Sequence, residues 1–194
     1  MEMMDPWKIQ DALDTYEVNY WGKGYFGIND RGHVTVHPYK RPEQAIDLKE
    51  LVDQLQERGI QLPILLRFTD ILRHRVGDIY EAFKNAIAES AYLGAYCCVY
   101  PVKGNQRRHV VEEILDCGKA LHFGLEAGSK PELLAVLALT NGDDTPIICN
   151  GFKDDEFIKM TMLARKMGKQ IIPVVEKYTE LETIVKHAEE LGVR

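Results

Sequence analysis

The sequence predicts an α/β protein with a parallel sheet, and two observations predict it. From residue 62 onward, short continuous apolar runs alternate five times with longer stretches in which apolar residues recur every three or four positions. Such runs are typical of strands buried on both faces, and such stretches are typical of the amphipathic helices that cover a sheet. Five strand–helix units fit a doubly wound sheet or part of an eight-stranded barrel, and spacing alone does not choose between them.

The N-terminal residues have a different pattern. Asp5 and Pro6 are typical of a helix start, with Asp5 as the cap. Two short strand-like runs within residues 25–36 flank a turn at residues 29–32. This arrangement predicts a β-hairpin.

Two histidines and one aspartate stand out in and after this hairpin. His33 and His37 could hold a metal, but on a strand they would lie far apart, so we interpret them as solvent-facing polar residues. Asp47 is expected to cap the next helix. We therefore expect residues 1–60 to be an N-terminal segment with a hairpin and a connecting helix, and residues 61–194 to carry the strand–helix repeats.

Each strand–helix unit has its own start signals. The expected strands lie at residues 63–68, 96–102, 121–125, 146–150 and 170–175. The side chains expected to cap the helices are Thr69, Ser129, Asp154 and Thr179. Ser129 and Thr179 are each followed three residues later by glutamate, which is the pattern of a capping box.

Composition describes an ordinary globular chain and excludes several classes of function. Of the 194 residues, 45% are hydrophobic and 28% are charged, and the net charge of -6 provides no basic face for nucleic acid or anionic lipid. The acidic N-terminus is not followed by an apolar core, and no apolar run approaches the length of a membrane span, so we expect neither a signal peptide nor a membrane segment. Cys97, Cys98 and Cys149 lie in apolar runs and are expected to be core residues of a cytoplasmic protein.

The side chain with the clearest chemical potential is Lys103, which follows an apolar strand. The C-terminal ends of parallel strands meet at one edge, where α/β proteins place their chemistry. A partly desolvated lysine at such a position is a candidate Schiff-base nucleophile, and the alternative is a surface lysine that begins a loop. Glu126, Asn150 and Glu176 end the next three strands and are expected at the same edge. Glu126 could instead be a structural carboxylate paired with a lysine, and Asn150 could bond its own loop.

Three motifs are specific in combination: YPVKGNQRR at 100–108, FGLEAGSKPEL at 123–133 and CNGFKD at 149–154. Together they resemble the biosynthetic arginine decarboxylase family, over about residues 16–194. The resemblance covers only the first part of that longer enzyme. It implies the barrel rather than the doubly wound sheet, so that the chain would supply the first five units of an incomplete (βα)8 TIM-type barrel. It also implies that the hairpin belongs to a separate β-domain completed by sequence not present here.

The resemblance also implies an activity. Lys103 would be the Schiff-base lysine for pyridoxal 5′-phosphate, with Glu126 and Asn150 as further coenzyme contacts. The reaction would convert L-arginine to agmatine and CO2 in polyamine biosynthesis, in a Mg2+-dependent homo-oligomer. In the family, the residues for the coenzyme phosphate, the pyridine nitrogen and the substrate come later than residue 194, so the isolated chain is expected to be inactive or nearly so.

Two other interpretations remain open. The chain could be a non-catalytic barrel that binds pyridoxal phosphate, or an inactive remnant of a truncated decarboxylase. A nucleotide-binding sheet is disfavoured, since no glycine-rich dinucleotide fingerprint follows a strand and no G-x-x-x-x-G-K-[ST] motif occurs.

Overall fold

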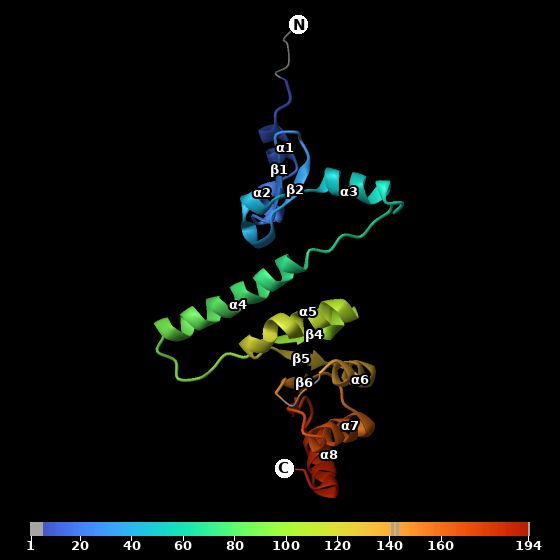
Figure 1. The fold of residues 1–194 in the computed structure, drawn as a ribbon. Helices are drawn as coiled ribbons and strands as arrows, with labels where there is room; N and C mark the ends of the chain where they lie inside the picture. The colour runs from blue at the N-terminus through green and yellow to red at the C-terminus, as the bar shows by residue number, and fades with distance from the viewer. Residues whose placement is uncertain (1–5, 141, 143, 194) are drawn as a thin grey trace. The chain divides into compact units, whose positions relative to one another are not determined.

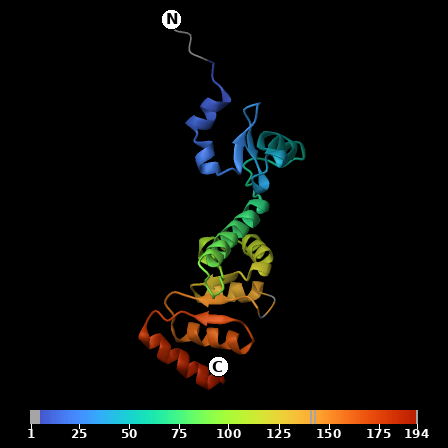
Figure 2. The same cartoon turned by 90° about the vertical axis from the view of Figure 1, so that its left-hand side faces the viewer.

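The computed structural model describes residues 6–140, 142 and 144–193. The chain divides into two compact units, Met1–His74 and Arg75–Arg194. The predicted helix cap Asp5 lies outside the described residues. Figures 1 and 2 show the helices and strands of both units.

The first unit holds a small antiparallel sheet with the strand order β1-β2-β3. Its elements are α1 (Ile9–Thr15), α2 (Val18–Gly22), β1 (Phe26–Ile28), β2 (Val34–Val36), the 3-10 turns η1 (Pro38–Lys40) and η2 (Pro42–Gln44), β3 (Ile46–Asp47) and α3 (Leu48–Glu57). The predicted hairpin is confirmed, since Phe26 pairs with Val36 and Ile28 with Val34. No pattern in the sequence predicts β3, because two residues directly before a helix are too few to show alternation of apolar and polar side chains.

Asp47 is the cap of α3, as predicted. Its carboxylate accepts hydrogen bonds from the backbone N–H groups of Lys49 at 2.9 Å and Glu50 at 3.1 Å. The same carboxylate lies 2.9 Å from Nδ1 of His33, and His37 Nε2 lies 2.8 Å from the Thr35 hydroxyl. Across the described part of the chain, no group of three or more histidine, cysteine or acidic side chains could hold a metal ion.

The expected first strand, residues 63–68, is wrong. These residues form no strand in the structure, and Leu65 is 67% exposed. An apolar run becomes a strand only when a neighbouring strand takes up its backbone hydrogen bonds. Among the described residues no strand pairs with this run, and Pro63 has no N–H to offer.

The second unit is built on four parallel strands in the order β4-β5-β6-β7, so the predicted five are reduced to four. The elements from residue 69 onward are α4 (Thr69–Glu89), β4 (Val99–Pro101), η3 (Val102–Gly104), α5 (Arg108–Gly118), η4 (Lys119–Leu121), β5 (Gly124–Ala127), α6 (Lys130–Leu139), β6 (Ile147–Cys149), α7 (Asp155–Lys166), β7 (Ile171–Pro173) and α8 (Tyr178–Leu191). Thr69, which was expected to cap its helix, is instead the first residue of α4. This is an α/β fold with a parallel sheet, as the alternating pattern predicts.

One face of this sheet forms the core of the unit. Leu125, Ala127, Ile147 and Cys149 are fully buried there, and they pack against apolar side chains of α5, α6 and α7, which lie along that face (Figure 1). The other face is more open, since Ile172 in β7 is 51% exposed. Because side chains alternate along a strand, each strand sends every second residue to this open face.

The helix caps agree with the sequence in part. Ser129 accepts a hydrogen bond from the backbone N–H of Glu132, and Asp154 accepts one from Phe157, so both predicted caps are confirmed. Thr179 is not a cap, because α8 begins at Tyr178 and is preceded by Lys177.

The cysteine predictions also divide. Cys149 is buried as predicted, and burial raises the pKa of its thiol to about 12. Cys97 is exposed, so its prediction as a core residue is wrong. The reason is that β4 begins only at Val99, and Cys97 belongs to the segment that leads into the sheet. Cys98 is half-buried.

No helix in the described part of the chain is long and apolar enough to cross a membrane.

Candidate active site

Lys103 lies in η3, immediately after β4 at the C-terminal edge of the parallel sheet. The loop that carries it is tied back to the strand, since the Tyr100 hydroxyl donates a hydrogen bond to the Asn105 carbonyl at 3.3 Å. The Asn105 side-chain oxygen accepts the backbone N–H of Arg107 at 3.2 Å, which closes a turn ahead of α5. The backbone around Lys103 is therefore held while the side chain, at 62% exposure, remains accessible.

Glu126 is the nearest acidic partner of this lysine. The Lys103 ammonium nitrogen lies 3.4 Å from Glu126 Oε1, and the Glu126 side chain is 20% exposed. The register of the sheet explains the meeting: Glu126 pairs with Pro101 of β4, two residues before Lys103. Glu126 alternates with the buried Leu125 and Ala127, so its side chain belongs to the open side of the sheet, and the turn η3 brings Lys103 to it. The partial desolvation expected for Lys103 is not found, since its side chain is 62% exposed.

Asn150 follows β6 at the same edge. Its backbone N–H donates to the Ala127 carbonyl at 3.0 Å, which extends the ladder between β5 and β6 by one more hydrogen bond. Ala127 directly follows Glu126, so this backbone hydrogen bond fixes the position of Asn150 along the strand direction relative to the Glu126 carboxylate. The structure thus brings Lys103 and Glu126 into contact and puts Asn150 on the neighbouring strand end.

Glu176 lies in the loop after β7, three residues beyond the end of the strand. Its carboxylate accepts the backbone N–H of Gly151 at 2.8 Å. It therefore joins the loop after β7 to the loop after β6. A buried ion pair between Lys153 and Glu180 lies beside it, with 3.1 Å between Nζ and Oε2. No signal in the sequence predicts this pair, since no spacing links Glu180 to Lys153.

Among the basic residues after Lys103, the side chain of Arg108 is 81% exposed and forms an ion pair with Glu112 at 2.7 Å, one helical turn further along α5. A pair at this spacing on a helix surface is a common solvated arrangement.

Burial raises the pKa of the Tyr100 phenol, so this group stays protonated and acts as the hydrogen-bond donor of the loop.

Comparison with known proteins connects this geometry to a family. The family described as pyridoxal-dependent decarboxylase, pyridoxal binding domain, matches residues 76–194. Among curated proteins, the chain is 51% identical over 188 residues to a biosynthetic arginine decarboxylase of Rhodopirellula baltica, covering 97% of this chain and 28% of that protein. It is 51% identical over 191 residues to one of Phocaeicola vulgatus, covering 98% and 30%.

A solved structure agrees with these similarities. The crystal structure of the biosynthetic arginine decarboxylase SpeA from Campylobacter jejuni superposes with a TM-score of 0.81 at 36% identity, covering 97% of this chain and 30% of that one. The chain thus spans less than a third of the length of these relatives. With the family match extending over more than half of its residues, the chain belongs to the pyridoxal-dependent decarboxylases and carries residues of their pyridoxal-binding domain.

Proposed function

We propose that this chain is the N-terminal portion of a pyridoxal-phosphate-dependent arginine decarboxylase that converts L-arginine to agmatine and CO2 for polyamine biosynthesis. The names of the relatives support arginine as the substrate. The observation that carries the proposal is the exposed amine of Lys103, 3.4 Å from Glu126, at the C-terminal edge of a parallel sheet in a pyridoxal-binding domain.

The residues at this edge fit the coenzyme chemically. A primary amine is the group that captures an aldehyde, and the Lys103 side chain is open enough for an aldehyde to reach it. When bound, pyridoxal phosphate supplies the electron sink for loss of CO2. The described residues supply the amine and a carboxylate, and we assign the phosphate site to residues outside this chain.

Three side chains have proposed roles. Lys103 holds the coenzyme through its amine. Glu126, whose carboxylate lies 3.4 Å from that amine, orients it. Asn150 offers an amide that can donate and accept hydrogen bonds at the neighbouring strand end.

The proposal includes an architecture for the whole protein. Residues 61–194 would be the N-terminal part of the (βα)8 barrel, and residues 1–60 would belong to a β-domain. Four parallel strands in chain order support the barrel, because their open face carries Glu126 toward what would be its interior. Homo-oligomerisation and Mg2+ dependence rest on the resemblance alone. The described residues contain no group of three or more candidate ligands, so we assign no magnesium site to them.

Covalent labelling tests the role of Lys103. The protein is incubated with pyridoxal phosphate and reduced with borohydride, and the modified lysine is located by mass spectrometry. We expect the label on Lys103 and its loss in Lys103→Ala. The control is Lys130→Ala, which removes another lysine that is paired with carboxylates, at Asp154 and Glu156. Labelling that persists in Lys103→Ala would refute the assignment.

The substrate is tested on the natural protein that contains this chain. We expect release of CO2 from L-arginine at a kcat/KM well above the values for L-lysine and L-ornithine. Labelling of Lys103 without decarboxylation of any amino acid would instead support the non-catalytic pyridoxal-phosphate protein.

A further inference from the structure

Lys153 is a charged side chain that the proposed chemistry does not use, although it lies three residues after Asn150. Its side chain has an exposed fraction of 0%, and its ammonium nitrogen lies 3.1 Å from Glu180 Oε2. The same nitrogen donates to the Gly151 carbonyl at 2.5 Å. Lys153 therefore does more than balance the charge of Glu180, since it also donates a hydrogen bond to the backbone of the loop after β6.

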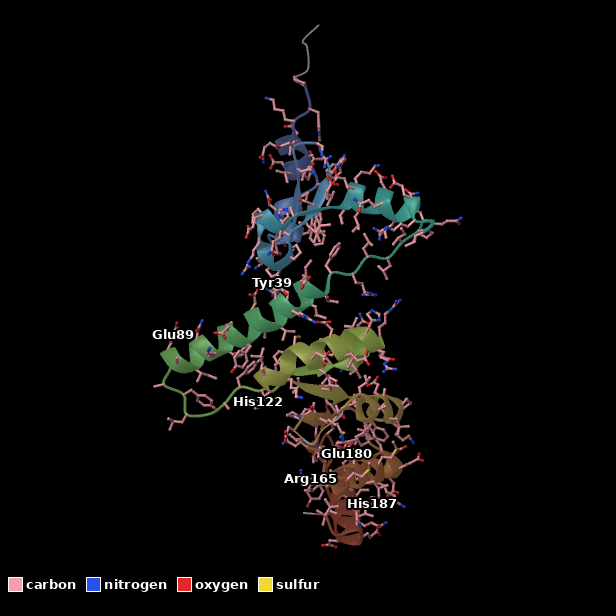
Figure 3. The ribbon with its side chains drawn as sticks, viewed as in Figure 1. Tyr39, Glu89, His122, Arg165, Glu180 and His187 are labelled. Atoms are coloured by element: carbon pink, nitrogen blue, oxygen red, sulfur yellow. The ribbon has the colours of Figure 1, made fainter. Side chains whose placement is uncertain are left out.

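Glu180, labelled in Figure 3, gathers backbone groups from two loops. Its carboxylate accepts the N–H of Lys153 at 3.1 Å, from the loop after β6, and the N–H of Glu176 at 2.8 Å, from the loop after β7. Burial by itself would raise the pKa of this carboxyl, but these two hydrogen bonds and the Lys153 side chain outweigh burial and lower the pKa to about 2. The carboxylate is thus a charged anchor shared by both loops.

The loop held in this way also touches the end of β5. Gly151 has a φ of +84°, and a Cβ at this position would come within 2.9 Å of the Gly128 carbonyl oxygen. Its N–H donates to Glu176, while Asn150 donates to Ala127. The segment 150–151 therefore lies between the ends of β5 and β7, and its position depends on contacts to both.

We propose that the Lys153–Glu180 pair is a positioning device that holds Asn150 at the strand-end edge, beside Glu126, in the geometry that the coenzyme requires. This inference rests on the proposed function. A buried ion pair does not by itself stabilise a fold better than apolar residues of the same volume would. Here the pair bonds the backbone of the loop that carries Asn150, at Gly151 and Lys153, and ties that loop to the backbone N–H of Glu176 in the loop after β7. This is the arrangement expected of groups that support a binding residue.

A double-mutant cycle tests the coupling. In the natural protein containing this chain, freed of coenzyme, affinity for pyridoxal phosphate is measured by absorbance titration in Asn150→Ala, Lys153→Met and the combined variant. We expect each single change to weaken binding about 10-fold, the scale seen when an outer-shell partner of a binding site is removed. The combined variant should be little weaker than Asn150→Ala, because Lys153 acts through Asn150. The control Lys130→Met removes a partly exposed ion pair and should bind normally.

Three results would overturn the proposal. One is normal binding by Lys153→Met, and another is losses that multiply to about 100-fold in the combined variant, which indicates independent action. The third is normal binding by Asn150→Ala, since the pair would then have nothing to position. In that case labelling of Lys103 would still stand, so the failure would be separate from that of the proposed function.

A second variant and a second readout cover a loss of folding in Lys153→Met. Glu180→Gln keeps the size of the side chain and enters the same cycle with Asn150→Ala, with the same expected outcome. Hydrogen exchange followed by mass spectrometry should show faster exchange of the loops at 150–153 and 174–177 in Glu180→Gln, with the strands unchanged. Unchanged exchange of both loops would contradict the positioning role.

Discussion

At the scale of single residues, Lys103 and Glu126 owe their contact to sheet register together with the turn after β4. Register pairs Pro101 with Glu126, and the 3-10 turn η3 that follows Pro101 brings Lys103 to 3.4 Å from the carboxylate. The resulting ion pair has one exposed member, so water competes for its charge and its contribution to stability is small. The contact matters for the candidate site because it fixes the position of the amine relative to the carboxylate.

Because the Lys103–Glu126 pair is partly exposed, Glu126→Gln should change the stability of the protein only slightly. Exposed pairs contribute about 0–1 kcal/mol, so the free energy of unfolding should change by less than ~1 kcal/mol. Urea denaturation of both proteins under the same conditions measures the difference. A loss of several kcal/mol would mean that Glu126 is a structural carboxylate, as the alternative interpretation of the sequence has it.

Glu180 predicts a dependence of stability on pH. Its pKa is about 2 in the folded protein, against an ordinary value of 4.5. A depressed folded-state pKa stabilises the fold fully above the unfolded value, so this contribution should be lost as pH falls from about 4.5 toward 2. The measurement is the free energy of unfolding against pH, for the unchanged protein and for Glu180→Gln. The difference between them should shrink through this range, and a difference independent of pH would contradict the assignment.

At the scale of elements, the short connections after β4 and β6 carry Lys103 and Asn150, and hydrogen bonds within and between the loops fix their backbone. The loop after β6 joins the ends of β5 and β7 through Gly151, whose backbone conformation favours glycine. The turn after β4 is held by Tyr100 and Asn105. Both connections lie at the C-terminal edge of the sheet, which is where α/β folds carry their functional groups.

Two glycines of these loops provide a matched comparison. Gly151→Ala should destabilise the protein by at least about 1–2 kcal/mol, the cost of a left-handed conformation for a residue with a Cβ, with the approach to Gly128 added. Gly104→Ala should change stability by less than about 0.5 kcal/mol, since a Cβ there meets nothing within 4 Å. Thermal and urea unfolding of both variants measure the contrast, and equal effects would refute it.

At the scale of the whole molecule, the sheet of the second unit has one well-covered face and one open face. In the described part of the chain, β4 and β7 each have a strand neighbour on one side only. Unpaired strand edges and exposed apolar side chains such as Ile172 favour association with other chains.

We therefore expect the 194-residue polypeptide, expressed alone, to self-associate. Light scattering coupled to size exclusion measures its mass as a function of concentration. Ile172→Lys on the open face should reduce association, while Leu134→Lys, at an exposed position of α6, should not. A monodisperse monomer with a sharp cooperative melt would contradict the expectation.

The sequence by itself determined the kinds of elements and most of their order. Apolar runs and helical spacing predicted the parallel sheet, the turn residues predicted the hairpin, and Ser129 and Asp154 predicted their helix starts. These features are local, since they depend on side-chain periodicity and on hydrogen bonds within a few residues.

Only the tertiary structure decided which residues meet. The apolar run at 63–68 has the composition of a strand, but a strand exists only where a partner supplies hydrogen bonds, and no strand among the described residues pairs with this run. The contact of Lys103 with Glu126 and the buried pair of Lys153 with Glu180 join residues 23 and 27 positions apart. Such contacts depend on sheet register and loop geometry, which no local pattern of the sequence encodes.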